Sequence, residues 1–258
     1  MGMILSVVNQ KGGVGKTTTA VNLTAALHAA GRRVLLCDFD PQANATSGLG
    51  VDKEQIRTST YDIVINGADV RSAVVYTKFG DLLPSAPSLS GAGVELVGIS
   101  DREHQLRRAL QALRPDYDFL FVDCPPSLEL LTLNALCAAD RILIPVQCEY
   151  YALEGLRDLM TTLRAVKRVL NPGLDIYGVL LTMFDGRTNL SMQVAEEVRR
   201  FFPGKVFSTV IPRNVRLSEA PSHGKPVTAY DSLSRGAEAY RSLAEELLEK
   251  NRCLAARL

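Results

Sequence analysis

The residues best suited to chemistry lie near the start of the chain, in one glycine-rich run. The run reads Lys11, Gly12, Gly13, Val14, Gly15, Lys16, Thr17 and Thr18. Between a strand and a helix, such glycines let backbone N–H groups turn inward and bind phosphate oxygens, aided by the partial positive charge of the helix N-terminus. Lys16 would then reach the β- and γ-phosphates, and the Thr17 hydroxyl would bind Mg²⁺. The run predicts a nucleoside-triphosphate site.

Three carboxylates follow two short apolar runs further along the chain. Asp38 and Asp40 stand at the end of Val34–Asp38, and Asp123 follows Phe119–Val122. The carboxyl ends of parallel strands face the crevice where open α/β sheets bind ligands. We expect one of Asp38 and Asp40 to orient an attacking water, and both, together with Asp123, to help place Mg²⁺ through water. A helix or loop cap is the alternative role for Asp38 and Asp40.

Alternating apolar runs and helix-period segments predict the framework that positions these residues. The expected strands are Ile4–Val8, Val34–Asp38, Asp81–Leu83, Phe119–Val122, Arg141–Val146, Ile176–Thr182 and Val206–Ile211. The expected helices are Lys16–Ala30, Arg102–Leu113, Leu128–Ala138, Leu153–Val169, Met192–Phe202 and Ser234–Glu249, with Ser85–Gly93 as a loop. This alternation predicts the α/β class, with a mostly parallel twisted sheet and helices on both faces. We expect residues 1–258 to form a single P-loop ATPase domain.

Composition narrows the class of protein. Of 258 residues, 47% are apolar and 22% are charged, which is ordinary for a globular domain with a sizeable core. The net charge of +1 means that any nucleic-acid or membrane partner must be bound by a local patch. No apolar run approaches the length of a membrane span. The five cysteines are odd in number and include no C-x-x-C pair, so we expect buried free thiols rather than disulfides or zinc ligands.

One departure from the general phosphate-loop pattern is informative. The glycine expected five positions before Gly15 is replaced by Gln10, and a second lysine, Lys11, follows it. Here the chain resembles the deviant Walker A family, which includes the ParA/Soj, MinD and nitrogenase iron-protein groups. The resemblance implies an ATP-dependent homodimer in which Lys11 reaches across the interface to the nucleotide of the partner, as an arginine finger does. A solvated loop lysine is the alternative.

Longer strings resemble the ParA/Soj branch from about Ile4 to Leu248. They are Asp40–Gln42 with Asn44–Gly50, Asp123–Ser127, Leu181–Asp185 and Ile211–Gly224. The resemblance implies a chromosome- or plasmid-partitioning ATPase that uses ATP/ADP and Mg²⁺, with Asp40 as the hydrolytic aspartate and Asp123 as the Walker B residue. It places Pro212 and Asn214 beside the adenine. It also implies that Glu149 contacts ribose across the dimer.

The same resemblance implies partners and a location. The ATP dimer would bind double-stranded DNA without sequence preference through Arg187 and Arg216, with Arg213 and Lys225 nearby. A ParB-type protein would stimulate hydrolysis, and the chain would be cytoplasmic and associated with the nucleoid. Solvated surface arginines are the alternative for these cations.

Two other branches of the family provide alternative functions. A MinD-like ATPase positioned on a membrane needs an amphipathic C-terminal segment, but the tail Lys250–Leu258 carries only two leucines, so we expect no membrane partner. An iron-protein-like electron carrier needs paired cysteines at the dimer axis.

Overall fold

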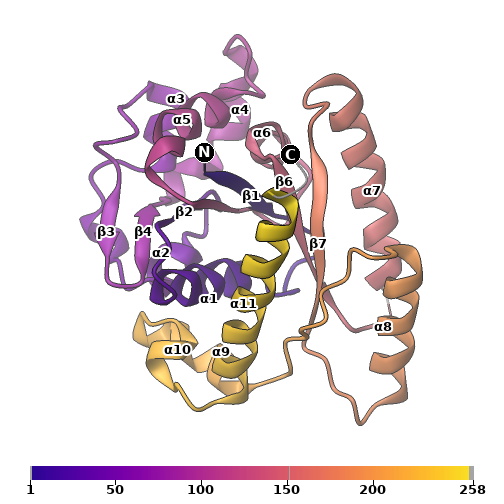
Figure 1. Ribbon diagram of the computed structural model, residues 1–258. Coiled ribbons are helices and arrows are strands. Elements are labelled where there is room, and N and C mark those ends of the chain that lie inside the picture. Colours follow the sequence, from indigo (N-terminus) through magenta and orange to yellow (C-terminus); the bar gives the residue numbers. More distant parts are fainter. Residues whose placement is uncertain (1, 151, 256–258) are drawn as a thin grey trace.

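The protein, described here by a computed structural model over residues 2–150 and 152–255, is built around one seven-stranded sheet (Figure 1). The strand order is β3-β4-β2-β5-β1-β6-β7. All neighbouring strands run parallel except β3 and β4. The strands are β1 (Met3–Val7), β2 (Val34–Asp38), β3 (Val75–Thr77), β4 (Gly80–Leu83), β5 (Phe119–Asp123), β6 (Arg141–Gln147) and β7 (Asp175–Thr182). The predicted α/β class with a mostly parallel sheet is confirmed.

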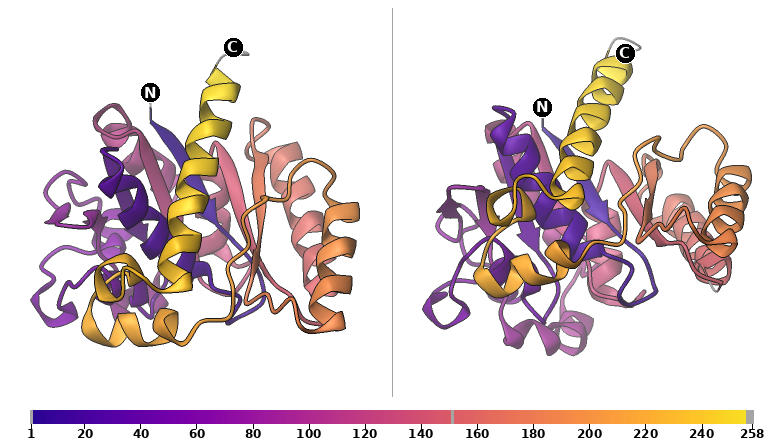
Figure 2. Two further views of the ribbon diagram at one scale, coloured as in Figure 1. Left: turned by 60° about the horizontal axis from the view of Figure 1, so that its bottom comes forward. Right: turned by 90° about the horizontal axis from the view of Figure 1, so that it is seen from below.

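Helices cover both faces of the sheet, as Figure 2 shows from two further directions. One face packs against α1 and α11, and the other against α3, α5, α6, α7 and α8. The longer helices are α1 (Lys16–Ala29), α3 (Thr60–Asn66), α5 (Gln105–Leu113), α6 (Leu130–Ala138), α7 (Ala152–Val169), α8 (Asn189–Phe201) and α11 (Arg235–Ala255). The short ones are α2 (Asn44–Gly48), α4 (Ala92–Glu95), α9 (Val215–Glu219) and α10 (Val227–Tyr230).

The central strands explain why the sequence shows continuous apolar runs. Every residue of β2 and of β5 is buried, because helices cover both faces of a parallel sheet. The two strands pair in register from Val34 with Phe119 to Asp38 with Asp123. Both strands therefore end at the same level, and their terminal carboxylates become neighbours at the carboxyl edge of the sheet.

The expected strand Val206–Ile211 does not form, which corrects the sequence prediction. The segment runs beside β7, but the bridge between Val179 and Val206 is isolated and no ladder continues from it. Its own N–H groups are partly taken by α11, because the Glu246 carboxylate accepts from the N–H groups of Ser208 and Thr209 at 2.7 and 2.8 Å. The Glu246 side chain thus binds N–H groups in the middle of the segment and interrupts a ladder with β7.

The predicted loop Ser85–Gly93 is also partly wrong. Pro87–Ser90 forms a 3₁₀ turn, and α4 begins at Ala92. The apolar side chains of Leu89 and Ala92 are fully buried in the core. The sequence did not predict this helical turn, because small residues and a proline are also typical of loops.

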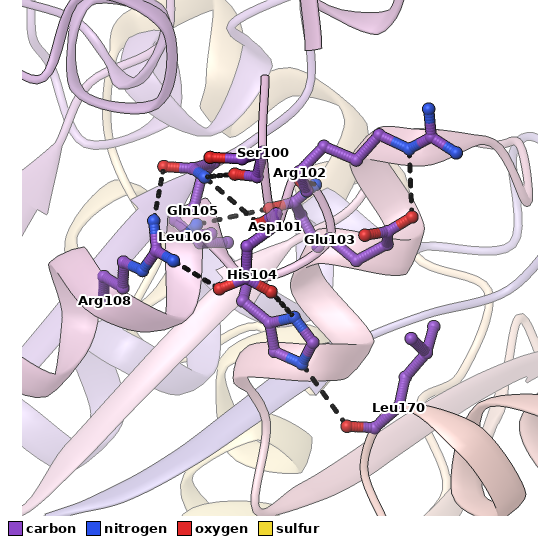
Figure 3. Close-up of polar contacts among 10 residues, drawn as sticks. Ser100, Asp101, Arg102, Glu103, His104, Gln105, Leu106, Arg108 and Leu170 are labelled. Carbon is purple, nitrogen blue, oxygen red and sulfur yellow. Dashed lines mark hydrogen bonds and ion pairs between the residues drawn. The ribbon is translucent and has the colours of Figure 1, made fainter. Parts of the chain in front are cut away.

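Polar contacts fix the start of α5 against the end of α7 (Figure 3). Asp101 adopts a left-handed φ of +56°, and its carboxylate pairs with Arg108 and lies 2.8 Å from Nδ1 of His104. The other ring nitrogen of His104 lies 3.4 Å from the Leu170 carbonyl oxygen. These contacts hold α5 in place over its face of the sheet.

All five cysteines lie within the described residues and are free thiols. Four are buried, as expected, but Cys253 on α11 is exposed. Its position near the end of the amphipathic α11 explains the difference, because the outward face of such a helix meets solvent.

The C-terminal tail begins as part of α11. Lys250 lies with Nζ at 5.3 Å from the ring centre of Tyr177 and 4.9 Å from that of Phe207, so its stem is packed on the protein. Residues 256–258, the remainder of the predicted tail segment, lie outside the described residues. Across 2–150 and 152–255, no helix has both the length and the apolar character needed to cross a bilayer.

Candidate nucleotide site

The glycine-rich run joins β1 to α1 at the carboxyl edge of the sheet, as predicted. Gly13 and Gly15 have φ values of +73° and +89°, which glycine adopts without strain. A Cβ built on Gly12 would meet nothing closer than 3.9 Å, and one on Gly13 nothing within 4 Å. The loop therefore combines a phosphate-loop backbone with open space in front of it.

Three side-chain hydrogen bonds anchor this loop to the sheet. Asn9 donates from Nδ2 to the Pro145 carbonyl at 2.7 Å, and its Oδ1 accepts from the Lys11 N–H at 3.0 Å. Thr182 at the end of β7 donates to the Val14 carbonyl at 2.8 Å. Sequence reasoning missed Asn9 and Thr182. The carboxyl-edge rule that found the aspartates would also have pointed to Thr182, whereas nothing local marks Asn9.

Lys16, predicted to contact the phosphates, is buried with its ammonium across the loop. Only 6% of the residue is exposed, and Nζ donates to the Lys11 carbonyl at 3.1 Å across the loop. Burial lowers the pKa of Lys16, while the nearby carboxylates of Asp123 and Asp40 act to raise it. The buried Lys16 ammonium is therefore available to bind an anionic ligand in the loop.

The predicted carboxylates converge beside Lys16. Asp38 and Asp123 are fully buried, and Asp40 is 7% exposed. Burial raises the pKa of Asp38 to about 6, despite hydrogen bonds from Thr46 and the Asp40 N–H that lower it. Burial, and then the charge of Asp38, raises the pKa of Asp123 well above its ordinary value.

Asp123 is the residue that best fits a bound metal ion. Within the described residues, neither of its buried carboxylate oxygens has a hydrogen-bond partner. A buried carboxylate without partners is costly unless a cation is bound near it. The half-buried Thr17 hydroxyl and the Lys16 ammonium act to lower the pKa of Asp123, but they do not offset its burial. Thr17 and Asp123 are therefore suited to hold Mg²⁺ directly or through water.

Lys11 points away from this cluster. Its Nζ lies 3.3 Å from Oε2 of Glu149, and 33% of the lysine side chain is exposed. The Glu149 carboxylate also faces Arg213 at 3.7 Å and accepts from Gln147. Within this chain, Lys11, which is predicted to act on a partner's nucleotide, is therefore paired with Glu149, which is predicted to contact ribose across the dimer.

A cavity of about 240 Å³ opens beside the phosphate loop. Pro212 and Asn214, the predicted adenine contacts, both line it, together with Gly15 and Thr18 of the loop. The other lining residues are Thr182, Met183, Ile211, Arg213, Leu217, Ser218, Pro221 and Tyr240. Met183 adopts a left-handed φ of +50°, a strained conformation of the kind that concentrates at ligand sites.

Most of the cations predicted to bind DNA are already paired. Arg187 contacts both oxygens of Asp185 at 2.9 and 2.8 Å. Arg216 lies 2.7 Å from Glu219 and 3.2 Å from Asp231. In the part of the chain that the structure describes, the exposed Lys225 has no ion-pair partner.

Arg213 differs from the other three predicted DNA contacts. It lines the cavity and lies 3.7 Å from Glu149, so it borders the candidate nucleotide site. Among the three arginines, Arg187 is the most exposed, with 89% of its side chain exposed against 65% for Arg213 and 47% for Arg216.

Comparison with known proteins agrees with this geometry. Residues 2–176 match the family described as an AAA domain. The sporulation initiation inhibitor protein Soj of Bacillus subtilis is 57% identical over 96% of this chain and 98% of its own. The chromosome partitioning protein ParA of Myxococcus xanthus is 52% identical over 97% of this chain and 89% of its own.

Solved structures extend the likeness to the whole fold. Cobyrinic acid a,c-diamide synthase from Mycobacterium smegmatis, with bound ADP and magnesium, is 38% identical with a TM-score of 0.86. The match covers 98% of this chain and 96% of that one. With a phosphate loop, buried carboxylates and close relatives over nearly its full length, the chain belongs to the Soj/ParA family of chromosome-partitioning ATPases.

Proposed function

We propose that the chain is an ATP-gated DNA-binding switch for chromosome or plasmid segregation. It binds ATP with Mg²⁺, forms a homodimer, and in that state binds double-stranded DNA without sequence preference. A ParB-type protein stimulates hydrolysis and returns the chain to a monomer that releases DNA. The whole chain acts as one ATPase domain, associated with the nucleoid in the cytoplasm.

The division of labour between two lysines carries this proposal. Lys16 is buried and contacts its own loop, whereas Lys11 is half-buried and its ammonium lies 3.3 Å from Glu149. A second cation that does not face its own phosphates is available to a partner's nucleotide. Dimerisation then depends on ATP, because only the triphosphate has the γ-phosphate that Lys11 of the partner would contact.

The remaining residues have separable roles in hydrolysis. Mg²⁺, when bound, supplies charge neutralisation for the β- and γ-phosphates. Thr17 and Asp123 would hold it, and Lys16 would bind the same phosphates from the loop side. Asp40 is the carboxylate that we assign to orienting the attacking water, because it alone of the three buried aspartates retains some exposure.

The proposal is tested with a fluorescently labelled duplex of random sequence. Anisotropy should report binding with ATP that is at least about 10-fold tighter than with ADP, and that weakens steeply with salt. Arg216→Glu should weaken the ATP-state binding by about 10-fold or more. Arg71→Glu is the matched control, because this arginine is also exposed and pairs with Asp116 at 2.6 Å, but at the opposite edge of the sheet.

Two results would overturn the proposal. Equal DNA affinity with ATP and with ADP would contradict the gate. Absence of DNA binding in both states, together with ATP-dependent co-sedimentation with anionic phospholipid vesicles, would replace the DNA switch by the MinD-like membrane function.

A further inference from the structure

Ser85, directly after β4, makes two hydrogen bonds to the segment that follows β2. It is fully buried, and its hydroxyl donates to the Asp40 carbonyl at 2.7 Å, 45 positions away in sequence. Its backbone N–H donates to Oγ1 of Thr46 at 3.1 Å. One residue thus joins the end of β4 both to the Asp40 loop and to α2.

These bonds belong to a closed ring around Asp40. Thr46 donates from N and from Oγ1 to Oδ2 of Asp38, both at 2.7 Å. The other oxygen of Asp38 accepts from the Asp40 N–H at 3.2 Å. Hydrogen bonds thus connect Asp38 to Thr46, Thr46 to Ser85, Ser85 to Asp40, and Asp40 back to Asp38. They hold the Asp40 backbone at both its N–H and its carbonyl.

The ring has little access to water. Asp38, Thr46 and Ser85 are fully buried and Asp40 is 7% exposed, so a lost bond is not readily replaced by solvent. The loop also contains Ala43 in a left-handed conformation, with φ of +52°. A strained turn of this kind persists only where the surrounding contacts over-determine it.

We propose that Ser85 is a positioning residue for ATP hydrolysis. Its hydroxyl holds the Asp40 carbonyl, which fixes the direction in which the Asp40 carboxylate leaves the backbone. Ser85 acts through Asp40, because its hydroxyl donates to the Asp40 carbonyl from a fully buried position. The inference rests on the hydrolytic role proposed above for Asp40. Small misplacements of a group that orients a reactant reduce rates far more than they reduce binding.

Steady-state ATPase assays with Mg²⁺ test this role in Ser85→Ala. We expect kcat to fall about 10-fold while the affinity for ATP stays within about 2-fold, because misplacement affects the reacting geometry alone. Ser6→Ala is the matched control, since Ser6 is also fully buried and donates to a carbonyl, that of Ala135, at 2.8 Å. Ser85→Thr, which keeps the hydroxyl, should recover most of the lost kcat.

The variants separate failure of this inference from failure of the underlying role. If Asp40→Ala abolishes hydrolysis but Ser85→Ala matches Ser6→Ala in kcat, the positioning role is wrong and the role of Asp40 stands. If Asp40→Ala hydrolyses ATP at the wild-type rate, the role of Asp40 fails, and the inference with it. A Ser85→Ala protein that loses ATP affinity and kcat together would contradict the inference and show a structural role. Ser85→Cys, which keeps a weak S–H donor, repeats the comparison if Ser85→Ala does not fold.

Discussion

The ammonium of Lys11 lies 3.3 Å from the Glu149 carboxylate of the same chain, and not on its own phosphate loop. Lys16 instead crosses that loop to the Lys11 carbonyl at 3.1 Å. The backbone of Lys11 thus supports the local site while its side chain remains outside. Under the proposed function, Lys16 would bind the nucleotide of its own chain, and Lys11 would bind the nucleotide of a second subunit.

The Lys11–Glu149 pair should contribute little to folding. Both side chains are partly exposed, at 33% and 44%, and such pairs are worth about 0–1 kcal/mol. We expect Lys11→Ala to shift the thermal midpoint of nucleotide-free protein by no more than about 4 °C, measured by circular dichroism. A fall of about 8 °C in the thermal midpoint would contradict this and show that the Lys11–Glu149 pair stabilises the fold.

Asp123→Asn should stabilise the protein when metal and nucleotide are removed. The pKa of Asp123 is raised in the folded state, and that of Asp38 is raised to about 6. Above about pH 4, the folded chain therefore binds more protons than the unfolded chain. The free energy of unfolding consequently falls as the pH rises from about 4 to 6 and above. With EDTA at pH 8, Asp123→Asn should melt about 2–6 °C above wild type.

The same variant should lose the benefit of metal. Adding Mg²⁺ and ATP should raise the thermal midpoint of wild type much more than that of Asp123→Asn, since binding to the folded state stabilises it. The advantage of the variant should shrink at pH 5. Asp116→Asn, on an exposed carboxylate, is the control. An Asp123→Asn protein less stable than wild type at pH 8 in EDTA would contradict the unpaired-carboxylate account.

Gly178→Ala should destabilise the edge of the sheet. A Cβ at Gly178 would lie 2.3 Å from the Phe207 ring, which packs where the expected last strand is missing. Overpacking of this kind costs about 1–3 kcal/mol, or about 2–10 °C in thermal midpoint for a chain of this size. Gly173→Ala is the control, because its Cβ would meet only Oδ1 of Asn171 at 3.8 Å. Equal midpoints for the two variants would contradict the close-packing argument.

Thr182→Val should weaken nucleotide binding without unfolding the protein. The Thr182 hydroxyl donates to the Val14 carbonyl at 2.8 Å and lines the cavity beside the loop. Loss of this bond, worth about 1 kcal/mol, should lower the affinity for ATP about 3- to 10-fold in calorimetric titrations. Thr161→Val on the exposed side of α7 is the comparison, and an unchanged affinity in Thr182→Val would show that the anchor is dispensable.

Sequence patterns predicted best where periodicity and chemistry coincide. Val34–Asp38 matched β2 residue for residue, and α1 began at Lys16 as expected. Both follow from local rules: a buried parallel strand is continuously apolar, and a phosphate loop must be followed by a helix. The carboxyl-edge rule likewise brought Asp38 and Asp123 together, because parallel strands in register end at one level.

Contacts between distant segments were beyond such reasoning. The failed strand at Val206–Ile211 has ordinary β-type residues, and its outcome depends on Glu246 in a helix 37 positions or more away. The ring through Thr46 and Ser85 is equally non-local. The pairing of Lys11 with Glu149 spans 138 positions. In each case the structure depends on contacts between segments far apart in the sequence, which a local pattern does not predict.

Sedimentation velocity in the presence of ATP or ADP tests the central claim, that Lys11 completes the site of a second subunit. The measurement is made in Asp40→Ala protein, to slow hydrolysis, with Lys11→Ala added in one sample and the loop-remote Lys78→Ala in another. We predict a dimer with ATP and a monomer with ADP, a monomer with both nucleotides once Lys11 is replaced, and a dimer retained in the Lys78→Ala control. An ATP dimer that survives Lys11→Ala, with ATP binding intact, would contradict the account.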